Sequence, residues 1–180
     1  MSLLTYLDLV DLVDQGMIEN LNHEQINGAS IDVTLGRYIW VEETSGYLVR
    51  LKEKQAPRMR KHDLVEEPYS LRPGEFILAQ TREVFGLPSD IAAEFKLKSS
   101  TARAGLDNAL ATWCDPTWNG SVLTLELKNN TQAHPLLLEI GMKIGQMIFF
   151  RGKAVPPEQS YATKGQYNND SVATQSKGAR

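Results

Sequence analysis

Residues 122–127 alternate between two kinds of side chain, and this alternation is the clearest in the chain. Side chains of an extended strand point alternately to its two faces. One face of this strand would carry three leucines: Leu123, Leu125 and Leu127. The other face would carry Val122, Thr124 and Glu126. A strand with one leucine face must pack on a core, so the pattern predicts a sheet covered by other elements.

Further short segments have an extended character and are separated by glycine and proline. They are residues 31–35, 76–79, 91–97, 135–140 and 144–150. Many short strands with such turns predict a mainly β domain, built as a barrel or a sandwich. Apolar residues at helical spacing within residues 3–13 predict one amphipathic helix that ends near Gly16 and covers the β structure. Residues 52–68 are strongly charged and predict an exposed loop.

Length and composition limit the class of protein. The 180 residues fit a single domain, taken as residues 1–180. A net charge of −3 argues against a broad basic face for nucleic acid. No apolar run approaches the ~20 residues of a membrane helix, and the N-terminus has no signal-peptide pattern. We therefore expect a cytoplasmic protein that binds neither nucleic acid nor a membrane. A single cysteine, Cys114, and three histidines argue against a structural zinc site.

The C-terminal tail, about residues 160–180, differs in composition from the rest of the chain. It is rich in Gln, Asn, Ser, Thr and Gly, and it has no apolar periodicity. We expect the tail to be mobile unless a ligand or a neighbour orders it.

Residues 98–103 could bind phosphate. They lie between a predicted strand and a predicted helical turn at residues 101–106, so Ser99 or Ser100 would cap that turn. The free N–H groups at the start of a helix and the charges of Lys98 and Arg103 suit a phosphate group. The same pattern is common in ordinary helix caps, so these residues alone leave both interpretations open.

Glu126 is a second candidate, because a carboxylate in the middle of a strand must face either water or a polar site. Most such glutamates face water, and this residue alone does not separate the two cases. An aromatic-rich segment, residues 113–120, precedes the strand and contains Asp115-Pro116. By itself it is only a turn.

Taken together, seven motifs resemble those of the dCTP deaminase family in order and spacing. They are Asn27-Gly28-Ala29-Ser30-Ile31-Asp32-Val33, Pro73-Gly74-Glu75-Phe76, Lys98-Ser99-Ser100 with Arg103, Gly105-Leu106, Ala111 to Asp115-Pro116, Thr124-Leu125-Glu126-Leu127 and Gly141-Met142-Lys143-Ile144-Gly145-Gln146. The resemblance covers about residues 26–176, and residues 41–66 add little to it. It implies a distorted, jelly-roll-like β-barrel of the dUTPase superfamily, with an N-terminal helix, assembled as a homotrimer with active sites between subunits.

The resemblance also implies roles for individual residues. Glu126 would transfer protons, flanked by Thr124 and Leu125, while Asp115 would contact the sugar and Ala111 would line the base site. The triphosphate would be held by Lys98, Ser99, Ser100, Thr101, Ala102 and Arg103. The tail would close over the nucleotide through Tyr161, Lys164, Tyr167 and Asp170. Asp170 stands where the family has a glutamine, and its charge would repel the triphosphate.

The chemistry of deamination agrees with these roles. Water must attack C4 of cytosine while ammonia leaves, and one positioned glutamate can remove and deliver the protons. Ser99 and Arg103 would polarise the water and stabilise the developing charge. Zinc-dependent deaminases instead use an H-x-E…P-C-x-x-C pattern, which this chain lacks, so we expect zinc-free catalysis and no protein metal ligand. Mg²⁺ would arrive with the triphosphate, held by phosphate oxygens and water.

Three functions compete at this stage. The leading expectation is deamination of dCTP to dUTP and ammonia, in the supply of thymidylate precursors. The first alternative is a bifunctional enzyme that also gives dUMP and pyrophosphate, favoured slightly by Thr112-Trp113 before Asp115. The second is a nucleotide-binding module without turnover, suggested by Asp170 and by the short loop at residues 107–110. The presence of Ser99, Arg103 and Glu126 together argues against that module.

Overall fold

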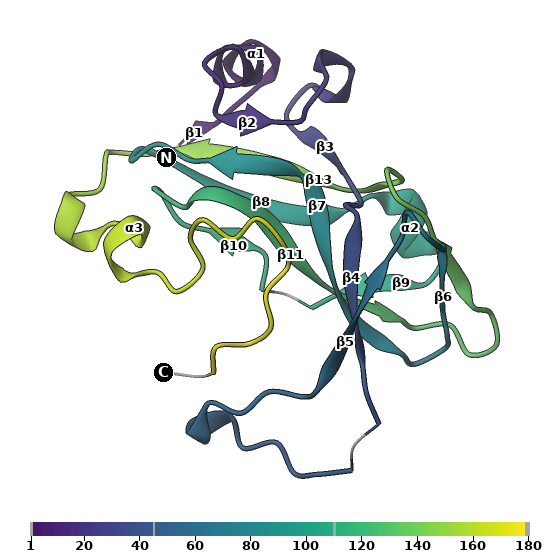
Figure 1. Ribbon diagram of the computed structural model, residues 1–180. Helices are drawn as coiled ribbons and strands as arrows, with labels where there is room; N and C mark the ends of the chain where they lie inside the picture. The colour runs from purple at the N-terminus through teal and green to yellow at the C-terminus, as the bar shows by residue number, and fades with distance from the viewer. Residues whose placement is uncertain (1, 45, 110, 179–180) are drawn as a thin grey trace.

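A computed structural model describes residues 2–44, 46–109 and 111–178, which form a mainly β structure (Figure 1). The α-helices are α1 (Tyr6–Asp14), α2 (Ser99–Arg103) and α3 (Tyr161–Lys164), and the 3-10 helices are η1 (His23–Gln25), η2 (Leu51–Glu53) and η3 (Pro157–Gln159). The strands are β1 (Ser2–Leu3), β2 (Ile18–Glu19), β3 (Ile31–Thr34), β4 (Tyr38–Glu42), β5 (Met59–Asp63), β6 (Tyr69–Leu71), β7 (Phe76–Gly86), β8 (Ile91–Leu97), β9 (Leu106–Asn108), β10 (Trp113–Cys114), β11 (Asn119–Asn129), β12 (Leu136–Leu138) and β13 (Lys143–Arg151). The predicted mainly β fold is confirmed.

The described strands pair antiparallel in separate sheets. One sheet has the order β1-β13-β8-β10, and β3 also pairs with β13. A second sheet has the order β5-β4-β7-β11-β9, and β2 also pairs with β7. Strands β6 and β12 pair with each other. Within the described residues, these sheets do not join into one closed barrel.

Strand β11 confirms the alternation that its sequence predicts. Leu125 and Leu127 are 1% and 0% exposed, and they pair with Ala79 and Ile77 of β7. The side chains of Leu125 and Leu127 belong to the hydrophobic core shared by the two larger sheets. Glu126 lies on the opposite face and is only partly buried. Strand β11 therefore has a core on one side and a candidate site on the other.

The predicted N-terminal helix is present as α1, which buries Leu9 and Leu12. It begins later than expected, because Leu3 pairs with Phe150 as part of β1 instead of joining the helix. Thr5 is the N-cap, and its backbone N–H donates to the carboxylate of Asp8 at 3.0 Å. Among the described residues, no helix is long and apolar enough to cross a membrane.

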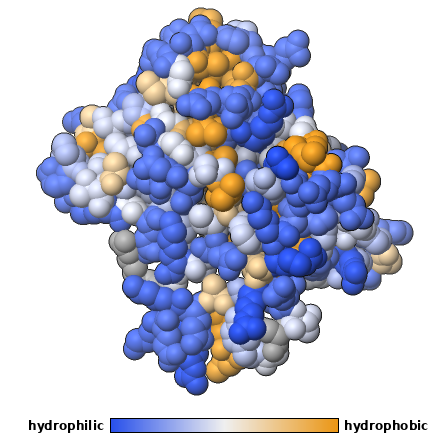
Figure 2. Space-filling model, viewed as in Figure 1, coloured by the Kyte–Doolittle hydropathy of each residue, from blue (hydrophilic) through white to orange (hydrophobic). Residues whose placement is uncertain are grey.

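The charged segment at residues 52–68 is only partly the predicted loop. Met59–Asp63 form β5, which pairs with β4 along its whole length because β-favouring Tyr38–Glu42 offers a free edge. We call residues 46–63 the arm. The arm projects at the bottom of Figure 1 and carries exposed Leu48 and Leu51, and Figure 2 shows apolar surface there among hydrophilic side chains.

Helix α2 is where the short helical turn was expected, but its cap differs. Lys98, with extended backbone, is the N-cap, and neither serine makes a side-chain cap hydrogen bond within the described residues. Thr101 instead donates its hydroxyl to the carbonyl oxygen of Lys98 at 2.7 Å. The helix therefore begins one or two residues earlier than the serine pattern predicts, and Leu106, the expected end of the turn, belongs to β9.

The tail runs along the second sheet. Its Ala173 is 1% exposed, accepts a hydrogen bond from the Trp40 indole at 2.9 Å, and donates its N–H to the side chain of Gln80 at 3.0 Å. The N–H of Thr174 donates to the hydroxyl of Thr124 at 3.3 Å. The sequence predicts mobility unless a neighbour orders the tail, and here the sheet is that neighbour.

Candidate active site

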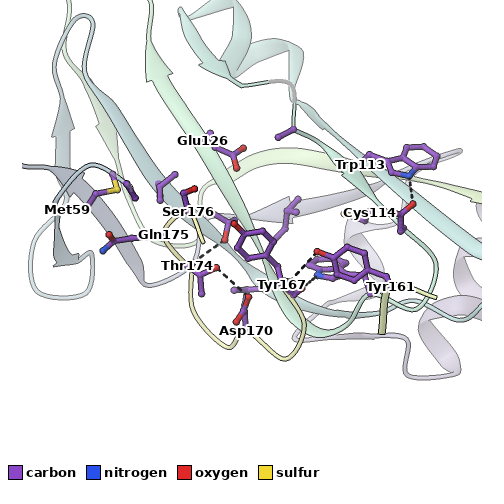
Figure 3. A pocket seen from close by; sticks show the side chains of 18 of the residues that line it. Met59, Trp113, Cys114, Glu126, Tyr161, Tyr167, Asp170, Thr174, Gln175 and Ser176 are labelled. Carbon is purple, nitrogen blue, oxygen red and sulfur yellow. Dashed lines mark hydrogen bonds between the residues drawn. The ribbon is translucent and has the colours of Figure 1, made fainter. Parts of the chain in front are cut away.

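A cavity of about 490 Å³ lies beside the face of β11 that carries Glu126 (Figure 3). Its lining comes from β7 and β11, from β10 and the turn after it, from the arm and from the tail. The volume is within the range of small-molecule sites. Most of the lining is apolar, and the side chains of Asp115, Glu126 and Asp170 bring carboxylates to it.

Glu126 has the properties of an acid–base group. Its Oε2 atom is buried and has no hydrogen-bond partner among the described residues. Burial raises the pKa of Glu126 to about 7, because a charged carboxylate loses hydration inside the cavity. A carboxyl group with this pKa can take up and release a proton at neutral pH. The backbone on both sides is fixed by the β11 ladder, and the Glu126 carbonyl accepts a hydrogen bond from Ala109 at 2.9 Å.

Asp115 lies at the same cavity, on the turn after β10. Its carboxylate accepts a hydrogen bond from the Trp113 indole at 2.9 Å, and the Trp113 ring stacks on Phe150 at 6.1 Å between centroids. These contacts hold the carboxylate at the cavity edge. Cys114 also lines the cavity, and burial raises the pKa of its thiol to about 12. The thiol therefore stays protonated and is a poor nucleophile.

The tail supplies another side of the cavity. Tyr161 and Tyr167 both line it, and the backbone N–H of Tyr167 donates to the Tyr161 hydroxyl at 3.3 Å. Asp170 accepts hydrogen bonds from Lys177 and from the Thr174 hydroxyl, both at 3.4 Å. The negative charge of Asp170 is thus paired within the tail (Figure 3 shows Thr174 beside it).

The predicted phosphate-binding stretch lies outside this cavity. Ser99, Ser100, Ala102 and Arg103 are exposed on α2, and no residue from 98–103 is among the described residues that line the cavity. Within one chain, the structure therefore does not bring the candidate phosphate groups to Glu126. It does bring Ala111, Asp115, Thr124, Glu126, Tyr161, Tyr167 and Asp170 together.

The structure places two further predicted site residues, Leu125 and Lys164, outside the described lining of the main cavity. The side chain of Leu125 is buried in the core and does not line the described cavity, because it points to the face of β11 opposite Glu126. Lys164 lines a second, smaller cavity together with Asp115 and Tyr161. Of the short loop at residues 107–110, residue 110 lies outside the described residues.

The sequence missed several residues of the main cavity. Gln175 and Ser176 lie in a polar tail without periodicity, and Met59 lies in the charged arm, so no local pattern marks them. Figure 3 shows Gln175 on the Met59 side of Glu126. The only available signal was the apolar character of Met59 within a charged segment.

No group of three or more His, Cys, Asp or Glu side chains among the described residues is placed to hold a metal ion. Mg²⁺ prefers oxygen ligands and would be held mainly by phosphate oxygens and water, whereas the described residues at the cavity lack the His/Cys cluster of a zinc deaminase. Zinc-free catalysis stays a prediction.

The antiparallel β scaffold places a protonatable, half-buried glutamate in a nucleotide-sized cavity. This arrangement is typical of an enzyme that works by general acid–base catalysis. The comparison with protein families is more specific. The model of a dCTP deaminase-like family matches residues 3–152, so the chain belongs to the dCTP deaminase-like family. The family predicted from the motifs, and with it the class of enzyme, is confirmed.

Two curated relatives have the same name, "dCTP deaminase, dUMP-forming". The protein from Acidothermus cellulolyticus is 40% identical over 81% of this chain and 76% of its own length. The protein from Streptomyces coelicolor is 37% identical over 90% of this chain and 86% of its own length. A solved structure, the 2'-deoxycytidine 5'-triphosphate deaminase from Agrobacterium tumefaciens, has a TM-score of 0.66 at 21% identity and covers 87% of this chain. The present chain spans half the length of that solved chain, and this likeness concerns the fold alone.

These relatives correct the leading functional expectation. The sequence favoured dUTP as the final product, but the relatives are named for the formation of dUMP. The first alternative, a bifunctional enzyme, therefore fits better. The motifs predicted the family, but they did not separate the two products.

Proposed function

We propose that this protein is a bifunctional dCTP deaminase that converts dCTP to dUMP, ammonia and pyrophosphate. The half-buried Glu126, with an unpartnered oxygen and a pKa near 7, is the observation that carries the deamination step. The choice of dUMP as the product is supported by the names of the curated relatives. The alternation of β11 explains why this carboxylate faces the cavity instead of the core.

In the first step, Glu126 takes a proton from a water molecule as its oxygen bonds to C4 of cytosine. Glu126 then returns this proton to N3 of the ring, takes the remaining proton from the new hydroxyl group at C4 and delivers it to the amine, so that the C4–N bond breaks and ammonia leaves. The oxygen of water becomes O4 of uracil. A pKa near the working pH suits both halves of this cycle, because the same group must accept and then donate.

In the second step, another water molecule attacks the α-phosphorus and breaks its bond to the bridging oxygen of the β-phosphate. The products are dUMP and pyrophosphate. Mg²⁺ held by phosphate oxygens and water would neutralise part of the triphosphate charge. Asp115 would meanwhile hold the sugar, Ala111 would line the base site, and Tyr161 and Tyr167 of the tail would cover the nucleotide.

We also propose that the complete site is shared between subunits of a homotrimer. The separation of the exposed α2 from the cavity of Glu126 supports this arrangement, because a neighbouring subunit could supply Ser99 and Arg103. There these groups would polarise the attacking water and bind phosphate. Lys98, Ser100, Thr101 and Ala102 would belong to the same supplied stretch.

The direct test is to incubate the protein with dCTP and Mg²⁺ and to separate the products by anion-exchange chromatography. We expect dUMP and pyrophosphate, with ammonia released in equal amount. Accumulation of dUTP without dUMP would contradict the second step, and binding of dCTP without any product would indicate a module without turnover. The control is Glu126→Gln, which should lower deamination by about 10²- to 10⁴-fold while nucleotide binding stays measurable.

A further inference from the structure

A buried ion cluster joins β3, β13 and the start of α2. Asp32 of β3 has a side chain that is only 3% exposed. Its Oδ1 atom accepts hydrogen bonds from the Lys98 ammonium at 2.7 Å and from the Asn27 amide at 2.9 Å. Its Oδ2 atom lies 3.0 Å from the Lys143 ammonium. One buried carboxylate therefore holds two lysines from different elements, one at the start of α2 and one in β13.

The cluster is placed where the candidate phosphate-binding stretch begins. Lys98 is the N-cap of α2, and its backbone N–H donates to the carbonyl of Ile144 at 3.3 Å, which ties this point to the start of β13 (Figure 1). Lys143 is the first residue of β13. The side chains of Lys98 and Lys143 are 28% and 56% exposed to solvent, whereas the carboxylate between them is buried.

The electrostatics favour a charged cluster. Burial acts to raise the pKa of Asp32, but the hydrogen bonds from Lys98, Lys143 and Asn27 outweigh it and lower that pKa overall. Asp32 is therefore ionised at neutral pH, and the three side chains carry one net positive charge. An ammonium group has three N–H donors, so a lysine that gives one to Asp32 can still donate to a phosphate oxygen.

We propose that Asp32 is a positioning residue for triphosphate binding, and that Lys143 is a second phosphate-binding cation held beside Lys98. This inference rests on the proposed function, because the phosphates of dCTP are the ligand. A free lysine side chain loses much rotational freedom when it binds. A carboxylate that orders both side chains in advance removes part of that loss from the binding step.

The role of Asp32 can be separated from a simple charge effect. If its carboxylate merely added negative charge near the phosphates, Asp32→Asn would strengthen triphosphate binding. If it positions the two lysines, the same change should weaken binding by about tenfold, as expected for a lost charge-assisted contact. The two explanations predict opposite signs.

The decisive measurement is the dissociation constant for inorganic triphosphate, determined by calorimetry on the full chain. Deoxycytidine and dCTP are further ligands, and the dCTP constants are measured in the Glu126→Gln background, because wild type would turn this nucleotide over during the titration. We expect Lys143→Met to weaken inorganic triphosphate and dCTP by about tenfold and to leave deoxycytidine unchanged. The matched control is Lys96→Met on β8, because Lys96 pairs with Glu94 and not with Asp32. It should change none of the three constants.

Asp32→Asn alters a buried group and can impair folding. If Asp32→Asn is unstable, Lys143→Met alone tests the inference. Where both fold, Lys143→Met should have a smaller effect in the Asp32→Asn background than alone, because the two act as one unit. Unchanged triphosphate affinity in Lys143→Met, or tighter binding in Asp32→Asn, would overturn the inference. Failure of wild type to turn over dCTP, with triphosphate binding intact, would instead reject the proposed function.

Discussion

Replacing Glu126 by glutamine should stabilise the protein at alkaline pH and leave its stability nearly unchanged in acid. Burial raises the pKa of Glu126 to about 7 from the 4.5 of an unburied glutamate, which also applies to the unfolded chain. The folded protein therefore holds this proton more tightly. The stability that protonation contributes is fully present below about pH 4 and is lost as the pH rises through about 7.

The size of the effect follows from the same shift. At about 1.36 kcal/mol per pH unit, the difference between the folded and unfolded pKa corresponds to about 3 kcal/mol of free energy of unfolding above about pH 8. Glutamine has the shape of the protonated side chain and no charge, so Glu126→Gln avoids this cost. Any defect in its packing acts equally at all pH values, and the pH-dependent part of the difference is therefore the quantity to measure.

The assay is urea unfolding of wild type and Glu126→Gln at about pH 4 and about pH 9, at one protein concentration because assembly also affects stability. The free energy of unfolding of Glu126→Gln, relative to that of wild type, should be about 3 kcal/mol higher at about pH 9 than at about pH 4. Glu139→Gln, which changes an exposed glutamate, is the matched control, and its free energy of unfolding relative to wild type should be the same at both pH values. An equal difference at both pH values would refute the argument that burial sets the proton affinity of Glu126.

Three other predictions concern the assembly, the metal and the tail. Arg103→Ala and Glu126→Gln should each be nearly inactive, yet refolding them together should restore part of the deamination, which an active site within one chain would not allow. A zinc-selective chelator should leave activity intact, whereas EDTA should lower it until Mg²⁺ is added; zinc in equal amount to active sites would contradict this. Asp170→Gln should raise the KM for dCTP by up to about fivefold, because it breaks the contact with Lys177, and truncation after Tyr161 should raise KM further. Tighter dCTP binding by Asp170→Gln would contradict this prediction and support the repulsion between Asp170 and the triphosphate that the sequence suggests.

Much of the fold was predictable because its signals are local. The alternation within β11 places Glu126 opposite Leu125 and Leu127 whatever the rest of the chain does, since the period of a strand is two residues. The helix α1 and the turns marked by glycine and proline depend on neighbouring residues in the same way. The ordered motifs added the family and several candidate residues, although not the final product.

The composition of the cavity could not be predicted from such patterns. Met59 and Gln175 line one cavity although more than a hundred positions separate them, and their meeting depends on how β4 pairs with both β5 and β7 and on the path of the tail. The pKa of Glu126 also depends on this packing, because it is the surrounding atoms that exclude water.

The sequence by itself therefore determined the mainly β class, which face of β11 carries the carboxylate, and the family, whereas β5 formed in a segment predicted as a loop. Only the tertiary structure decided that the arm and tail line the cavity, that α2 stays outside it, and that Asp32 holds Lys98 and Lys143 together. The physical reason is range: backbone periodicity acts between residues two to four positions apart, whereas burial, ion pairs and cavities depend on residues that only the register of distant strands brings into contact.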